Sequence, residues 1–175
     1  MSDPHSPLRL NVGFIVAQSA GYSRDFTVEL PQVRLPPDLV LTNLIGEVRV
    51  SRTPQGLLLQ ANIHADIGLE CVRCLETFSA ILNANFTELY AFTRRNITES
   101  GLLVPDDGQI DLEPLLREYM LLELPINPLC RPDCKGLCPV CGENRNIVNC
   151  DHEYEPIDPR LDGLKKLLDD NYSAS

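Results

Sequence analysis

The sequence predicts an α+β fold, in which an antiparallel β-sheet or small open barrel carries one packed helix and is followed by a cysteine-rich module with a short terminal helix. Three observations predict it. Apolar and polar residues alternate in several runs between residues 47 and 92, the period of half-buried strands. A run near residue 115 has the helical period instead. Five of the seven cysteines lie between residues 130 and 150.

The chain has 175 residues, of which 43% are apolar and 23% are charged, an ordinary globular composition. This length is enough for a core domain and a small appended module. We expect residues 1–128 to form the β core and residues 129–175 to form a zinc-binding module with a C-terminal helix, docked on the core. No secretory signal or membrane-spanning run is visible, so a cytoplasmic protein is expected.

The first strands are predicted from short runs. Residues Leu10–Ala17 are rich in β-formers and predict an opening strand. Residues Asp25–Val33 alternate weakly and are bordered by prolines, which favours an edge strand.

A clear hairpin follows. Glu47–Ser51 alternates, and Thr53–Gly56 has proline second and glycine fourth, as in a type I turn. The returning strand has the strongest alternation in the chain, and the following apolar residues share one face: Leu59, Ala61, Ile63, Ala65, Ile67 and Leu69. His64 lies among polar neighbours on the other face, which favours a solvated histidine over a ligand.

A C-x-x-C pair, Cys71 and Cys74, follows that strand directly, and alternation resumes from Ala80 to about Tyr90. The pair is therefore predicted at a hairpin tip. A thioredoxin-like redox pair belongs at the N-terminus of a helix, whereas a hairpin tip suits a zinc knuckle.

A helix is predicted over residues 111–124, after a polar excursion that spans residues 93–109. Asp111 can cap it, Glu113 and Arg117 can form an i,i+4 pair, and Pro125 follows it. Its apolar face is expected to pack on the sheet, and it comprises Leu112, Leu115, Leu116, Tyr119, Met120 and Leu124. Asp158 followed by proline predicts the start of the terminal helix.

The cysteines are interpreted as metal ligands. Disulfides do not persist in a reducing cytosol, and an odd number of cysteines would leave one thiol over. Zinc takes four ligands in a tetrahedron, and closely spaced pairs supply two corners each. Four such pairs make two complete zinc sites from the following residues: Cys71, Cys74, Cys130, Cys134, Cys138, Cys141, Cys150 and His152.

Two groupings of these ligands are open. Only eight residues separate Cys141 from Cys150, so we favour one compact site formed by residues 138, 141, 150 and 152. The pair at residues 71 and 74 would then join the pair at 130 and 134. The rival grouping takes residues 130, 134, 138 and 141 as one local site. Reduced structural thiols without metal, or a redox disulfide at Cys138 and Cys141, are further readings.

The net charge of −10 argues against a broad basic surface for nucleic acid. Four cations fall beside the cysteine pairs, namely Arg73, Arg131, Lys135 and Arg145. They can offset thiolate charge, or form a small surface that touches RNA or a partner. No nucleophile elbow, phosphate-binding loop or HExxH motif is present, and fully coordinated metals leave no position for a bound water, so no enzyme is expected.

The sequence resembles the YceD-like family, the large ribosomal RNA subunit accumulation proteins. The resemblance rests on G-x-S-R-D-F at residues 21–26, on the hairpin that ends in Cys71-Val-Arg-Cys74-Leu, and on Asp111-Leu to Leu124-Pro. It continues through the run from Cys130 to Gly142, its most specific part, to Asp158-Pro-Arg-Leu. Where relatives commonly end the cluster with Cys-x-Cys, this chain has His152 in the last position.

The resemblance implies a role in synthesis, processing or stability of 23S ribosomal RNA, and hence in large-subunit assembly. The expected partners are a ribosomal precursor, a ribosomal protein or an RNA-processing factor. A redox-active or metal-sensing cysteine protein is the competing hypothesis.

Overall fold

The structure is a computed structural model that describes residues 7–152, and these fall into two compact units. The sheet unit comprises residues 7–70 and 77–128, and the cysteine unit comprises residues 71–76 and 129–152. The short helix predicted from Asp158 lies outside the described residues.

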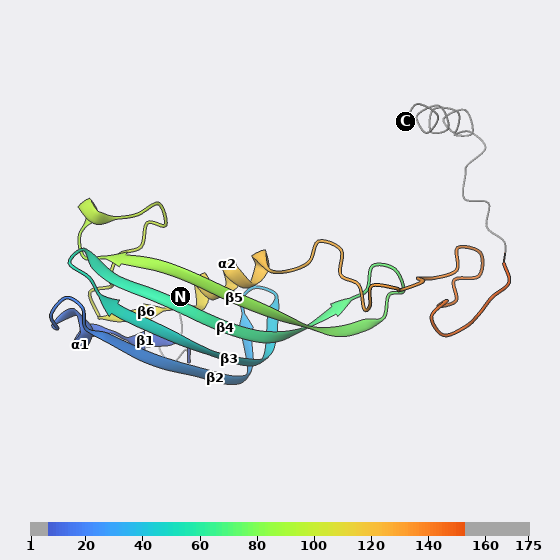
Figure 1. Ribbon diagram of the computed structural model, residues 1–175, viewed down its shortest axis with the longest axis horizontal. Helices are drawn as coiled ribbons and strands as arrows, with labels where there is room; N and C mark the ends of the chain where they lie inside the picture. Colours follow the sequence, from blue (N-terminus) through green and yellow to red (C-terminus); the bar gives the residue numbers. More distant parts are fainter. Residues whose placement is uncertain (1–6, 153–175) are drawn as a thin grey trace, which may run out of the picture. The chain divides into compact units, whose positions relative to one another are not determined.

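Four long antiparallel strands form the main sheet of the sheet unit (Figure 1). They are β2 (Ser23–Leu35), β3 (Leu39–Arg52), β4 (Gly56–Glu70) and β5 (Thr77–Ala91). The strand order is β2-β3-β4-β5, which leaves β2 and β5 at the two edges. The sheet is therefore open, and the antiparallel sheet of the predicted fold class is confirmed.

The alternation read from the sequence identifies the core face of this sheet. Val48, Leu59 and Ile63 are each 0% exposed, whereas His64 is exposed on the opposite face. Val48 lies opposite Ala61 and His64 opposite Asn83 in the strand register. The hairpin predicted around residues 53–56 is confirmed, because the chain returns from β3 to β4 there.

A β-bulge in β3 changes which residues face the core. The register with β4 shifts between Thr42 and Ile45, and Asn43 has a φ of 49°. Leu41, before the shift, and Leu44, within it, are both fully buried although they are three positions apart. The extra residue thus keeps both halves of β3 packed on the core, and the Asn43 amide donates to Asp66 at 2.8 Å.

The N-terminal segment differs from its prediction. Strand β1 (Arg9–Asn11) pairs with β6 (Gln109–Asp111), and the helical turn α1 (Gly13–Val16) follows it. A strand over Leu10–Ala17 is therefore wrong beyond Asn11. The backbone N–H groups of Val12 and Gly13 both donate to the Gly108 carbonyl, which turns the chain and ends the strand.

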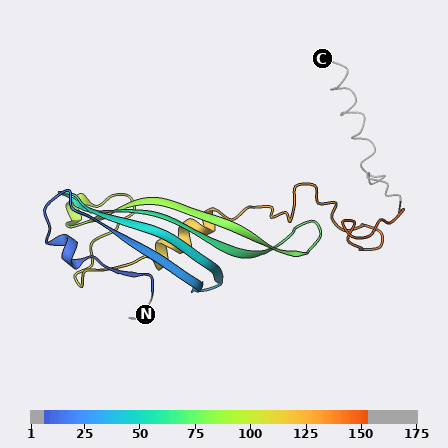
Figure 2. The same cartoon turned by 60° about the horizontal axis from the view of Figure 1, so that its bottom comes forward.

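Helix α2 (Glu113–Leu122) lies within the range predicted for it and packs on one face of the sheet (Figures 1 and 2). The rings of Tyr119 and Phe86 of β5 stack with their centroids 4.4 Å apart, and the Tyr119 hydroxyl donates to Glu88 at 2.7 Å. The N-cap of the helix is Leu112 and not Asp111 as predicted, although the Asp111 carboxylate accepts from the Glu113 N–H at 3.0 Å.

The structure gives Arg117 a different partner from the one predicted. Its guanidinium donates at 2.9 Å to Asp38, which lies in the turn between β2 and β3, rather than to Glu113. In the part of the chain that the structure describes, no helix has the length and apolar character to cross a membrane.

Candidate metal centre

The first cysteine turn, Cys71–Glu76, joins β4 to β5 and belongs to the cysteine unit. The Leu75 N–H donates to the Cys71 carbonyl at 2.9 Å, and the Cys71 N–H donates to the Glu76 carbonyl at 2.9 Å. Leu75 has a φ of 60°, in the left-handed region. These two hydrogen bonds close the six residues into a tight loop, as a metal knuckle requires.

The second cysteine turn, Cys138–Glu143, has the same pattern of hydrogen bonds. The Gly142 N–H donates to the Cys138 carbonyl, and the Cys138 N–H donates to the Glu143 carbonyl, both at 2.8 Å. Gly142 has a φ of 75°, which its missing side chain permits. The sequences C-V-R-C-L-E and C-P-V-C-G-E therefore form one kind of turn.

The first group of candidate ligands comprises Cys71, Cys74, Cys130 and Cys134, whose sulfur atoms all lie within 4.8 Å of one another. The Sγ atoms of Cys71 and Cys134 are 3.8 Å apart, and those of Cys74 and Cys130 are 3.6 Å apart. A tetrahedral zinc with Zn–S bonds of about 2.3 Å requires sulfur-to-sulfur distances of about 3.8 Å. The four thiols thus fit one tetrahedral ion.

The second group comprises Cys138, Cys141, Cys150 and His152, whose ligand atoms also lie within 4.8 Å of one another. The His152 Nδ1 atom is 3.8 Å from the Cys138 Sγ atom, near the tetrahedral edge of about 3.6 Å for a mixed sulfur and nitrogen pair. The structure brings the eight residues together in the favoured grouping, and the rival grouping is not the one it forms. Both groups can hold a metal ion.

The two groups differ in exposure to solvent. In the first group, Cys71 is 0%, Cys134 3% and Cys74 4% exposed. In the second group Cys138 is buried, but Cys141 and His152 are exposed. Reagents in solution therefore have easier access to the second group.

Backbone amides and burial set the ionisation of the first group. The pKa of Cys71 is lowered to about 6, chiefly because the Cys130 backbone N–H donates to its sulfur, with the N–H groups of Cys74 and Arg73 contributing. Burial raises the pKa of Cys130 to about 12, and the neighbouring sulfurs add to this. Four such close thiols ionise together only when a cation offsets their charge.

The second group has a similar electrostatic pattern. The pKa of Cys138 is lowered to about 6, first by the Cys141 backbone N–H and then by that of Val140. The pKa of Cys150 is raised, first by its contact with the Cys138 sulfur and then by burial. The backbone amides of this turn therefore point toward the sulfur of its first cysteine.

Arg73 links the first cysteine turn to the segment that carries Cys134 through two hydrogen bonds. Its guanidinium donates to the Cys134 carbonyl at 3.0 Å, and its own carbonyl accepts from the Leu137 N–H at 3.0 Å. Gly136, with a φ of 72°, allows this approach, because a Cβ atom there would lie 3.0 Å from the Arg73 carbonyl oxygen. Arg73 thus has a structural contact beyond the charge role predicted for it.

Asn146 contacts a candidate ligand of the first group, and the sequence did not reveal this contact. The Asn146 side-chain nitrogen donates to the Cys134 sulfur at 3.3 Å, and the Asn146 side-chain oxygen accepts from the Lys135 backbone N–H at 2.9 Å. Burial opposes ionisation of Cys134, but the Asn146 amide and the Gly136 N–H outweigh burial, so the pKa of Cys134 is lowered. Asn146 lies twelve residues from Cys134 along the chain, so no local sequence pattern predicts this hydrogen bond.

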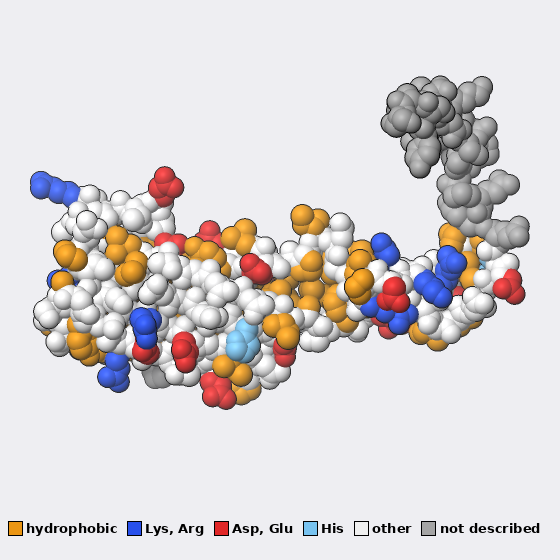
Figure 3. All heavy atoms as spheres, viewed as in Figure 1, with side chains coloured by type: hydrophobic (Ala, Val, Ile, Leu, Met, Phe, Trp, Pro, Cys, Tyr) orange, Lys and Arg blue, Asp and Glu red, His pale blue; other side chains and the backbone are white. Residues whose placement is uncertain are grey.

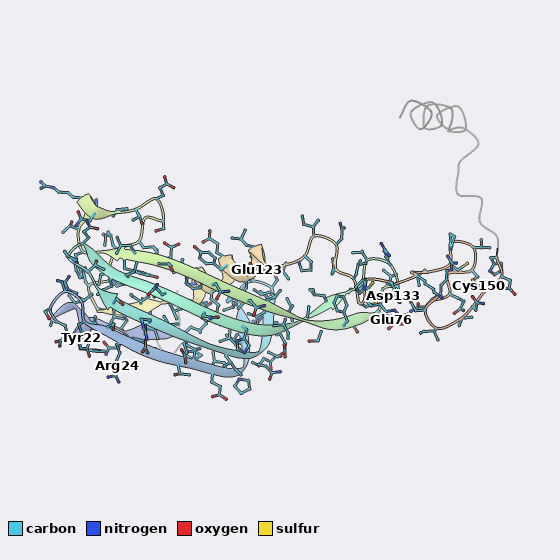
Figure 4. The ribbon with its side chains drawn as sticks, viewed as in Figure 1. Tyr22, Arg24, Glu76, Glu123, Asp133 and Cys150 are labelled. Carbon is cyan, nitrogen blue, oxygen red and sulfur yellow. The ribbon has the colours of Figure 1, made fainter. Side chains whose placement is uncertain are left out.

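The predicted basic residues do not form a single-sign patch. Arg131 pairs with Asp133 at 3.6 Å, while Lys135 and Arg145 are exposed. Among the described residues of the cysteine unit, the four cations are matched by four acidic side chains, which are Glu76, Asp133, Glu143 and Asp151. Acidic and basic side chains accordingly lie interspersed in Figure 3. Glu76, Asp133 and Cys150 are labelled in Figure 4.

An open antiparallel sheet with one packed helix, together with two groups of four candidate ligands that each include one cysteine turn, defines an α+β protein with two candidate metal sites. The model of the family described as large ribosomal RNA subunit accumulation protein YceD matches residues 59–168. The chain belongs to this family. The matched residues contain both ligand groups.

Several known proteins are similar to this chain. An uncharacterized protein of Mycobacterium tuberculosis is 36% identical over 126 residues, which cover 70% of this chain and 60% of that protein. The chloroplastic large ribosomal RNA subunit accumulation protein YCED homolog 1 is 28% identical in Arabidopsis thaliana and 42% identical in Zea mays. These matches cover 69% and 62% of this chain, and 47% of each plant protein. No solved structure matches the chain.

Proposed function

We propose that the protein is a non-enzymatic factor for synthesis, processing or stability of 23S ribosomal RNA in assembly of the large ribosomal subunit. The family match carries this proposal, because it spans residues 59–168 and the family is described as large ribosomal RNA subunit accumulation proteins. The two plant relatives have the same description. The match covers 60% of the first mycobacterial relatives, so the role is proposed for the part that this chain shares with them.

The two ligand groups would hold structural zinc. The donor set is thiolate and imidazole, which zinc prefers, and the ligand separations fit a tetrahedron in both groups. Zinc supplies no open coordination position when four protein ligands surround it, so its contribution is to folding. The first group would fasten the turn at residues 71–76 to the segment around Cys130 and Cys134.

The cysteine unit would serve as the contact surface. It exposes several apolar side chains, with Val72 52%, Leu75 56%, Val140 59% and Ile147 75% exposed. Its described charges balance, which suits a protein or ribonucleoprotein partner better than bare phosphates. The proposed partners are a ribosomal precursor, a ribosomal protein or an RNA-processing factor, met in the cytoplasm.

Depletion of the protein tests the role. We expect fewer large subunits in ribosome profiles and less 23S ribosomal RNA, with both restored by the wild-type chain. The Cys71→Ser/Cys74→Ser chain should restore neither, whereas His64→Ala, an exposed change on the sheet, should restore both. Unchanged ribosome profiles after depletion would contradict the proposal.

The exposure of Cys141 and the pKa of about 6 at Cys138 favour a second candidate, a redox-active or metal-sensing cysteine pair. Metal content and thiol titration of protein purified under reducing conditions separate the two. Two zinc ions per chain and slowly reacting thiols support the structural role. A disulfide that forms and reduces readily between Cys138 and Cys141 supports the second candidate.

A further inference from the structure

The loop between Cys141 and Cys150 contacts the first ligand group, although both of its ends belong to the second. The Arg145 backbone N–H donates to the Gly136 carbonyl at 3.0 Å. The Asn144 side chain donates to the Glu76 carboxylate at 3.4 Å, and Asn144 also forms a β-bridge with Leu137. The loop thus lies against both segments that supply the first group.

Asn146 makes the direct contact with a ligand of the first group. Its Nδ2 atom lies 3.3 Å from the Cys134 sulfur, and its Oδ1 atom accepts from the Lys135 N–H at 2.9 Å. Its orientation is fixed from within the loop, because Asn144 Oδ1 accepts from the Asn146 side chain at 2.8 Å and from its backbone N–H at 3.0 Å.

We propose that Asn146 couples the two groups, so that closure of the second group around an ion raises the affinity of the first group for its own ion. This inference rests on the proposed metal role of the two groups. Closure of residues 138, 141, 150 and 152 fixes both ends of the loop and removes most of its conformations. Asn146 is then held ready to donate to Cys134 when the first group closes, so less conformational entropy is lost at that step.

The direction of the effect follows from the chemistry of the hydrogen bond. The Asn146 donor lies 3.3 Å from the Cys134 sulfur and stabilises the negative charge that this sulfur keeps when it is bound to a metal, so the contact strengthens metal binding by the first group. Coupling between two binding events is reciprocal, so filling the first group also tightens the second. Couplings of this kind commonly change affinity by about 5- to 150-fold.

Titration of the full metal-free chain with Co²⁺ under reducing conditions tests the coupling. Four thiolates and three thiolates with one imidazole give different absorption bands, so the two groups are followed separately. In the Cys138→Ser/Cys141→Ser chain, which disables the second group, we expect the Co²⁺ affinity of the first group to fall by about fivefold or more. Cys150→Ser disables the same group at a different position and should act likewise.

Asn146→Asp tests the residue that carries the coupling. The aspartate keeps an oxygen for the Lys135 N–H but replaces the donor on Cys134 with a second oxygen. We expect it to lower first-group affinity in the wild-type background, to shift the thiolate-to-cobalt absorption, and to have a much smaller effect when the second group is disabled. Asn149→Asp makes the same change of charge at an exposed position in the same loop, and should leave the first group unchanged.

Equal first-group affinity with and without the second group would overturn the coupling while leaving the metal role intact. An equal loss from Asn146→Asp in both backgrounds would also overturn it, since the loss would then be local. If neither group binds Co²⁺ or Zn²⁺, the proposed metal role fails and the coupling fails with it. Circular dichroism of each variant confirms that the sheet is folded before its affinity is compared.

Discussion

Leu75 and Gly142 occupy the same position in the two cysteine turns. Each follows the second cysteine of its turn, each has a left-handed φ, of 60° and 75° respectively, and each donates its N–H to the carbonyl of the first cysteine. An L-residue in this region is strained by roughly 1–2 kcal/mol, whereas glycine is not. The first turn therefore tolerates a strain that the second avoids.

This difference predicts opposite responses to substitution. Gly142→Ala should weaken zinc retention by the second group by roughly 1 kcal/mol, about fivefold in affinity, because alanine adds the left-handed strain. Leu75→Gly should leave the first group nearly unchanged, since relief of strain is offset by the greater freedom of glycine in the unfolded chain. Competition with a calibrated zinc chelator measures both affinities.

Gly101 provides the matched control for that measurement. It has a φ of 70°, and a Cβ atom there would meet nothing within 4 Å, as at Gly142, but it lies in the sheet unit. Gly101→Ala therefore adds similar backbone strain far along the chain from the ligands. An equal loss of zinc affinity in both variants would show that the second turn has no special part in retention.

The exposure of the ligands predicts the order in which metal is lost. With excess chelator, zinc should leave in two phases, the faster from the second group, where Cys141 and His152 are exposed, and the slower from the first, where Cys71 is fully buried. The Cys138→Ser/Cys141→Ser chain should lack the faster phase. A single phase in the wild-type chain that persists in this variant would contradict the order.

The strands were predictable because their signal is local. Alternation of apolar residues over residues 59–69 reports one buried face directly, and the structure confirms it. The bulge at Asn43 was not predictable, since it appears in sequence only as a break in the alternation. The end of β1 at Asn11 depends on the Gly108 carbonyl, almost a hundred residues away, so β-propensity alone gave too long a strand.

The ligand set was also predictable from a local signal, because cysteine pairs at the spacing of a zinc knuckle are visible directly in the sequence. Their grouping followed from counting ligands and from the short loop before Cys150. The contacts of Arg73 and Asn146 were not predictable, because each depends on a backbone or sulfur atom brought near by the turns themselves. Residue type alone suggested that Arg73 offsets thiolate charge or contacts RNA or a partner, and it suggested no role for Asn146.

The contacts of Arg73 predict a structural effect of its removal. Arg73→Ala deletes the donor to the Cys134 carbonyl, and we expect zinc retention by the first group to fall by about 1 kcal/mol, the value of one partly exposed hydrogen bond. Lys135→Ala is the matched control, because the Lys135 side chain is exposed. The substitution also keeps the backbone N–H of residue 135, which donates to the Asn146 side chain.

These two variants, together with Arg145→Ala, separate the structural role from RNA contact. Under the structural role, only Arg73→Ala changes zinc retention. If these cations instead bind phosphates, Lys135→Ala and Arg145→Ala should reduce co-sedimentation with ribosomal particles at low salt, and the reduction should diminish as salt is raised. Zinc retention that is unchanged in Arg73→Ala would contradict the structural role.

Tyr90 predicts a loss of stability at alkaline pH. Burial, followed by the charges of Glu88 and Asp111, raises its pKa from 10.0 to about 12, so the fold favours the neutral phenol. Its contribution to the free energy of unfolding is therefore complete below about pH 10 and is lost as the pH rises through about 12. Urea denaturation of the sheet at several pH values should show this decline, and Tyr90→Phe should reduce it. Thiol titration affects the wild-type and Tyr90→Phe chains equally, so it cancels when their free energies of unfolding are subtracted. If the two free energies fall in parallel as the pH rises, Tyr90 ionises freely in the folded protein.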